Sequence, residues 1–176
     1  MRHTISLFVD NESGVLSRVA GLFSARGFNI ESLNVAETLD PDTSRITIVT
    51  SGDDFIIAQI IKRFNNMVNV IWVDDLTDDP HVEREMVLVR VGAETEYRAE
   101  ILRTADIFRA KVVDVGRKSY TLELTGDKNK ITAFIDLLMP MGIIEIARTG
   151  TVAMKREPKI LNDKADDVEG DKGDEK

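Results

Sequence analysis

The sequence predicts an α+β protein built from two ferredoxin-like domains in tandem, each with the element order β-α-β-β-α-β. Three observations lead to this fold class. Short apolar segments alternate with amphipathic helical patterns in that order through the first half of the chain. The second half repeats the order, and an acidic break, D-D-L-T-D-D-P at 74–80, separates the halves.

The first half begins with a strand that ends at the loop D-N-E-S-G. The helix after it carries Leu16, Val19 and Phe23 on one stripe and ends at Gly27. The second helix carries Phe55, Ile56, Ile60, Ile61 and Phe64, which we expect to cover one face of the sheet. The predicted elements are strand 4–9, helix 15–26, strand 28–38, strand 44–51, helix 53–65 and strand 68–74.

The second half predicts strand 84–91, helix 95–108, strand 111–116, strand 119–124, helix 128–139 and strand 143–151. Pro140 and Gly142 close the last helix. When the two halves are aligned with Arg18 opposite Arg103, apolar helix positions of one half fall opposite apolar positions of the other, which indicates a repeated fold. The predicted boundaries are 1–77 and 83–156 for the domains and 78–82 for the linker.

Composition narrows the functional classes. The chain has no cysteine, so disulfides and thiolate sites are excluded. It has only two histidines, so a metal site built from histidine has few candidate ligands. The net charge of −8 argues against nucleic-acid and anionic-lipid partners. Half of that charge lies in 157–176, an acidic tail that we expect to be disordered. Without an apolar run of about 20 residues or a signal peptide, we expect a cytoplasmic protein with no membrane partner.

The loop 10–16, D-N-E-S-G-V-L, is the candidate binding site. The start of a helix presents free backbone N–H groups and the positive end of the helix dipole, which together suit a carboxylate or phosphate. Gly14 leaves room for a ligand, and the Asn11 amide both donates and accepts hydrogen bonds. The alternative is that Asp10, Asn11 and Ser13 are ordinary cap and turn residues.

Two further features leave alternatives open. The segment 68–73 is almost wholly apolar, which indicates either burial by self-association or simply good strand formers. The sequence contains no H-E-x-x-H, G-x-S-x-G, Walker A or G-x-G-x-x-G motif. It therefore offers no nucleophile with its base, and binding is favoured over catalysis.

The motif D-N-E-S-G-V-L-S-R-V-A-G-L-F-S-A-R-G-F-N-I-E-S-L-N-V, from Asp10, resembles the opening of the regulatory small subunit of acetolactate synthase. That family begins with an ACT domain, here 1–77. The resemblance continues through S-R-I-T-I-V from Ser44, H-V-E-R-E from His81, I-F-R-A-K-V-V-D-V from Ile107 and I-E-I-A-R-T-G from Ile144. It covers about nine-tenths of the chain and leaves the tail unmatched.

The resemblance implies a homodimer through the ACT domains, with an amino acid bound between the first loop of one chain and the second strand of the other. It implies that the backbone N–H groups of Gly14, Val15 and Leu16 donate hydrogen bonds to the carboxylate of the amino acid. It places polar contacts at Asn11 and Asn29, with Ile30 beside the effector side chain. The implied effector is valine, with leucine or isoleucine as alternatives, and Asn34 departs from the family's frequent threonine.

By the same resemblance the chain performs no chemistry and holds no cofactor itself. It would bind the large catalytic subunit, which uses thiamine diphosphate, magnesium and FAD, and would activate it and make it sensitive to feedback inhibition. One alternative is a stand-alone amino-acid-binding ACT protein acting on a different partner. A nucleic-acid-binding ferredoxin-like module would need exposed strand aromatics and a basic face, and neither is evident.

Overall fold

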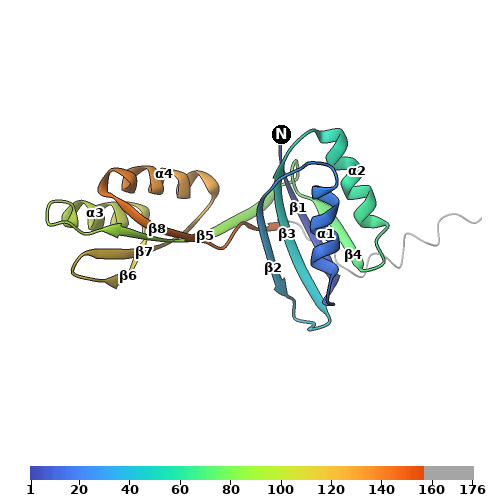
Figure 1. Cartoon of the computed structure of the whole chain (residues 1–176), viewed down its shortest axis with the longest axis horizontal. Helices are drawn as coiled ribbons and strands as arrows, with labels where there is room; N and C mark the ends of the chain where they lie inside the picture. Colours follow the sequence, from blue (N-terminus) through green and yellow to red (C-terminus); the bar gives the residue numbers. More distant parts are fainter. Residues whose placement is uncertain (157–176) are drawn as a thin grey trace, which may run out of the picture.

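The computed structural model describes residues 1–156 (Figure 1). The disorder predicted for 157–176 therefore lies outside the described residues. The elements of the first domain are β1 (Arg2–Asp10), α1 (Val15–Ser24), β2 (Ile30–Glu37), β3 (Thr43–Ser51), α2 (Asp54–Asn65) and β4 (Val70–Asp75). Those of the second are β5 (His81–Gly92), α3 (Arg98–Phe108), β6 (Lys111–Val115), β7 (Ser119–Gly126), α4 (Lys128–Leu138), the 3₁₀ turn η1 (Met139–Met141), β8 (Ile143–Arg148) and β9 (Val152–Lys155).

Each domain is an antiparallel sheet with two helices on one face, as Figure 1 shows. The strand order is β2-β3-β1-β4 in the first sheet and β6-β7-β5-β8 in the second, with β9 added beside β5. These orders are equivalent when the strands of each domain are counted from its own start. The predicted fold class, two ferredoxin-like units in tandem, is confirmed.

Each domain has its own core beneath its helices. In the first, Phe23 of α1 meets Phe64 of α2 with ring centroids 5.8 Å apart. In the second, Phe108 of α3 meets Phe134 of α4 at 5.3 Å. One expectation for the first core is wrong, because Phe55 is 72% exposed and the buried residue in that turn of α2 is Ile57. The helical stripe runs through Ile57, Ile60 and Phe64, a spacing of three and four that places them on one face.

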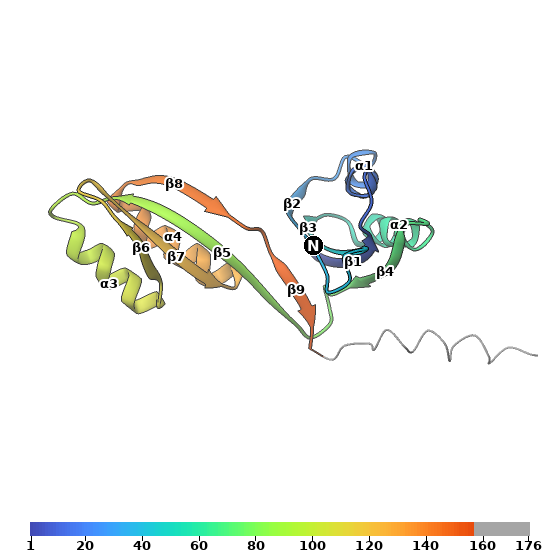
Figure 2. The same cartoon turned by 90° about the horizontal axis from the view of Figure 1, so that it is seen from below.

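The segments that join the domains differ from the sequence-based elements. Strand β5 begins at His81 rather than at Arg84, because His81–Arg84 pairs with β9. The strand expected over 143–151 ends at Arg148 as β8, before Gly150, which adopts a left-handed backbone with φ of +80°. Strand β9, from Val152, was not predicted. Figure 2 shows β5 running from one domain to the other with β8 and β9 alongside it.

The first domain contacts the β8–β9 connection directly. The Ser32 hydroxyl on β2 accepts a hydrogen bond from the Thr151 backbone N–H at 2.7 Å. Arg45 on β3 donates from Nη2 to the Ala153 carbonyl at 2.9 Å. Burial lowers the pKa of the Arg45 guanidinium, and the charge of Asp74 opposes that shift. Strands β2 and β3 of the first domain are thus attached to the second domain by polar contacts.

Candidate functional site

The start of helix α1 is the first part of the candidate site. Gly14 precedes the helix with φ of +85°, and the helix has neither a side-chain cap nor an acidic residue in its first turn. A side chain built at Gly14 would meet nothing within 4 Å, so the space before the helix is open. Of the three predicted donors, the Val15 N–H contacts the Glu12 carbonyl at a long 3.3 Å. This end of α1 therefore offers backbone donors and the positive end of the helix dipole to an approaching anion.

The loop before α1 is held by a side chain that the sequence did not single out. Asn69, next to β4, donates from Nδ2 to Asp10 Oδ2 at 3.1 Å and to Glu12 Oε2 at 3.2 Å. Its Oδ1 accepts from Arg18 Nη1 of α1 at 2.7 Å. The only local signal was a polar residue that interrupts the apolar run 68–73. These contacts fix the loop against both the helix and the neighbouring strand, so the donors are preorganised.

Asn11 joins the loop to the β2–β3 hairpin. Its Nδ2 donates to the Pro41 carbonyl at 2.9 Å and to Glu37 Oε1 at 3.3 Å. Its Oδ1 accepts from Ser44 Oγ at 3.0 Å. Both amide hydrogens and the oxygen are thus engaged within the chain. The role predicted for Asn11 in contacting an effector stays a prediction, and its role in positioning the loop is visible in the structure.

The remaining predicted residues lie at the other end of the sheet. Ile30 pairs with Thr50, which pairs with His3 at the start of β1, whereas Asp10 pairs with Thr43. Thr43 and Thr50 therefore mark the two ends of β3, and at roughly 3.3 Å per residue they lie about 23 Å apart. One chain therefore brings together Asn11, Gly14, Val15 and Leu16 but not Asn29 and Ile30. A site that uses both groups requires two chains.

Asn29 and Ile30 are placed differently with respect to solvent. Asn29 is exposed, and its carbonyl accepts from Thr50 Oγ1 at 2.7 Å. Ile30 packs partly against the core of the first domain. In the first loop, Val15 is only 2% exposed and anchors α1, whereas Leu16 is 41% exposed. The free surfaces at the two ends are therefore the α1 start with Leu16 and the Asn29 side chain.

The equivalent helix of the second domain is built differently. Helix α3 begins after Tyr97, which has a right-handed helical backbone, and carries Glu100 in its first turn. The Arg98 side chain occupies this end by donating to the carbonyls of Ala93 and Arg117. The sequence at this end, T-E-Y-R-A-E-I from Thr95, contains glutamate and no glycine. Within residues 1–156, helix α3 therefore lacks the open, glycine-led start that α1 has.

Two further classes of site were searched for in residues 1–156. In that part of the chain no group of three or more His, Cys, Asp or Glu side chains is placed to hold a metal ion. No helix there is long and apolar enough to cross a membrane.

Comparison with known proteins shows the family. Residues 5–72 match the model described as the "AHAS small subunit-like ACT domain", and residues 84–157 match that of the "Small subunit of acetolactate synthase". A probable acetolactate synthase small subunit from Archaeoglobus fulgidus is 53% identical over 159 residues, covering 90% of this chain and 99% of the relative. The isozyme 3 small subunit of Escherichia coli is 45% identical over 92% of this chain and 99% of its own length.

A solved structure agrees with these sequence relatives. The crystal structure of the acetolactate synthase small subunit from Thermotoga maritima superimposes with a TM-score of 0.81 at 42% identity. The match covers 90% of this chain and 99% of that one. The likeness therefore extends over both domains and their connection.

Proposed function

Because the chain belongs to the acetolactate synthase small-subunit family, we propose that it is the regulatory subunit of acetolactate synthase in branched-chain amino acid synthesis. It performs no catalysis itself. It activates the large catalytic subunit, which supplies thiamine diphosphate, magnesium and FAD, and it makes that subunit sensitive to valine or another branched-chain amino acid.

The observation that carries the binding part of this proposal is the open start of α1. The effector carboxylate accepts hydrogen bonds from the backbone N–H groups of Gly14, Val15 and Leu16. The long Val15 contact to Glu12 is weak enough to be exchanged for a charged acceptor. The carboxylates of Asp10, Glu12 and Glu37 surround the loop and favour the effector ammonium.

The effector side chain requires the second chain of a homodimer. Within one chain Asn29 and Ile30 are at the far end of the sheet from the loop, so a twofold arrangement supplies them from the partner. Asn29 contacts the polar groups of the effector, and Ile30 borders its branched side chain. A small apolar pocket wall selects valine, leucine or isoleucine over polar amino acids.

Inhibition then follows from differential binding. The effector changes the relative populations of two domain arrangements, and only one of these makes the activating contact with the catalytic subunit. The β2 strand is suited to this coupling, because it begins at the proposed effector site and continues to Ser32, which contacts the second domain at Thr151.

The test is reconstitution with a catalytic subunit. Acetolactate formation is measured with and without the chain, and with valine, leucine and isoleucine in turn. We expect the chain to raise activity and one of these amino acids to reduce it. If the chain neither co-purifies with a large subunit nor changes the activity of that subunit, the stand-alone ACT protein is favoured instead.

Gly14→Asp tests the site itself. The new carboxylate stands before the α1 donors and repels the effector carboxylate, so inhibition is lost while activation remains. Gly142→Asp is the matched control, because Gly142 also has a left-handed backbone, with φ of +84°, and nothing within 4 Å of an added side chain. Unchanged inhibition in Gly14→Asp would show that the effector binds elsewhere.

A further inference from the structure

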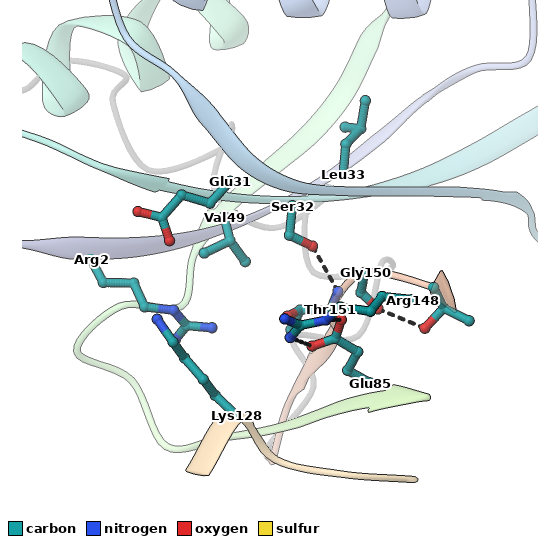
Figure 3. A pocket seen from close by; sticks show the side chains of 11 residues that line it. Arg2, Glu31, Ser32, Leu33, Val49, Glu85, Lys128, Arg148, Gly150 and Thr151 are labelled. Carbon is teal, nitrogen blue, oxygen red and sulfur yellow. Dashed lines mark hydrogen bonds and ion pairs between the residues drawn. The ribbon is translucent and has the colours of Figure 1, made fainter. Parts of the chain in front are cut away.

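A cavity of about 380 Å³ lies where the two domains meet, and no residue of the proposed effector site lines it (Figure 3). Its wall combines β1 and β2 of the first domain with β5, α4 and the β8–β9 connection of the second. Charged and hydroxyl side chains dominate its wall, among them Arg2, Glu31, Ser32, Glu85, Lys128 and Arg148.

The cations of this cavity are not equally neutralised. Arg148 is fully paired, donating from Nε and Nη2 to the two Glu85 oxygens, each at 2.6 Å. These hydrogen bonds raise the pKa of the Arg148 guanidinium. Arg2 is only partly paired, because Nη2 donates to Glu83 at 2.9 Å while its buried Nε has no partner in residues 1–156. Glu83 therefore neutralises the Arg2 guanidinium through one nitrogen only, in contrast to the bidentate pair at Arg148.

Lys128 is the second cation of the cavity that is not neutralised by a bidentate carboxylate. It is the first residue of α4 and is exposed, and within the described part of the chain its ammonium has no carboxylate within ion-pair distance. In Figure 3 the cationic ends of Arg2 and Lys128 point toward one another from opposite domains. Two like charges that converge repel each other unless an anion lies between them. Their convergence is notable in a chain of net charge −8.

The remaining walls define the size and chemistry of an occupant. The Ser32 hydroxyl already accepts from Thr151 N–H, so its own hydrogen is available to donate into the cavity. Glu31 accepts from Ser51 Oγ and places a negative charge on the same wall. An anion is therefore favoured on the Arg2–Lys128 side and opposed near Glu31, which restricts the site to a small group.

We propose that this cavity binds a small oxyanion, the phosphate or carboxylate group of a metabolite, between Arg2 of the first domain and Lys128 of the second. The Arg2 guanidinium and Lys128 Nζ donate charge-assisted hydrogen bonds to it, and Ser32 adds a neutral one. Because the ligand contacts both domains, it stabilises the arrangement in which β1 and α4 face the same cavity. It is a regulatory site distinct from that of the amino-acid effector.

Titration calorimetry on the full chain tests this site at constant ionic strength, with inorganic phosphate in one series and succinate in another. We expect saturable binding of at least one anion, and the two series distinguish phosphate from carboxylate recognition. Lys128→Ala should weaken binding about tenfold, the equivalent of one charge-assisted hydrogen bond, and Lys128→Arg should retain it. Lys62→Ala, which removes an exposed lysine from α2, is the matched charge control and should bind as the native chain does.

Absence of saturable binding for both anions would overturn the proposal, as would equal affinities for Lys128→Ala and the native chain. Valine titration of the same variants separates this site from the effector site. A Lys128→Ala chain that loses the anion but still binds valine supports two independent sites. A native chain that binds the anion but not valine would contradict the proposed effector site alone.

Discussion

The two domains share a fold but begin their first helices in opposite ways. Helix α1 follows Gly14, whose backbone is left-handed, and carries no acidic residue in its first turn, although neither α1 nor α3 has a side-chain cap. Helix α3 follows Tyr97, which has a right-handed helical backbone, and carries Glu100 in its first turn. The Arg98 side chain at the start of α3 donates to two backbone carbonyls. Equivalent strand orders therefore do not imply equivalent binding ability. The capacity to hold an anion at this position depends on a few residues before the helix.

The two domains also differ in what surrounds that helix end. In the first, Asn69 and Asn11 hold the loop in place from β4 and from the β2–β3 hairpin while leaving the α1 start open. In the second, the Arg98 guanidinium at the start of α3 donates to the backbone carbonyls of Ala93 and Arg117. The α3 start, with Glu100 in its first turn and no glycine before it, is therefore less suited to an incoming carboxylate than the α1 start.

The largest effect is expected from removing one aromatic ring from either core. Phe64→Ala and Phe134→Ala each delete a fully buried ring and should each cost about 3–5 kcal/mol. If the domains are separate in stability as well as in function, Phe64→Ala abolishes valine binding and Phe134→Ala leaves it intact. Urea unfolding followed by circular dichroism, with valine titration in parallel, measures both. Equal loss of valine binding in the two variants would show that the cores unfold as one unit.

An intermediate effect is expected at the joint between the domains. In Gly150→Ala the new methyl would lie 2.8 Å from Ser32 Oγ and 3.3 Å from the Leu33 carbonyl, and the φ of +80° adds strain. Gly142→Ala has the same strain without a contact. Gly150→Ala should therefore be about 1–3 kcal/mol less stable than Gly142→Ala, the usual cost of overpacking.

The same pair of variants tests how inhibition reaches the second domain. If β2 carries the signal through Ser32, Gly150→Ala should bind valine normally yet lose much of its inhibition in the reconstituted enzyme. Gly142→Ala should keep both. A dose–response curve for valine against acetolactate formation separates these outcomes. Normal inhibition in Gly150→Ala would exclude the Ser32–Thr151 contact as the route.

Periodicity and caps were sufficient to predict the order of the helices and strands from β1 to β8 and the loop before α1. Gly14 and Gly27 bracket α1, and the apolar stripe between them is local information. Asn69 was not predicted as a site residue, because its partners Asp10 and Glu12 are far away in sequence. The break at Gly150 was missed for a similar reason, since it depends on docking against Ser32 rather than on local pattern.

The smallest effect decides between the two interpretations of the loop before α1. Asp53 and Asp127 cap α2 and α4 by accepting backbone hydrogen bonds, so Asp53→Ala and Asp127→Ala should each cost about 1 kcal/mol. Ser13 makes no side-chain hydrogen bond in residues 1–156, and Ser13→Ala should change stability by only about 0.3 kcal/mol. Thermal unfolding of the three variants measures this contrast. A loss at Ser13 as large as that at Asp53 would mean that α1 is an ordinary capped helix, with its donors already satisfied and none left for an effector.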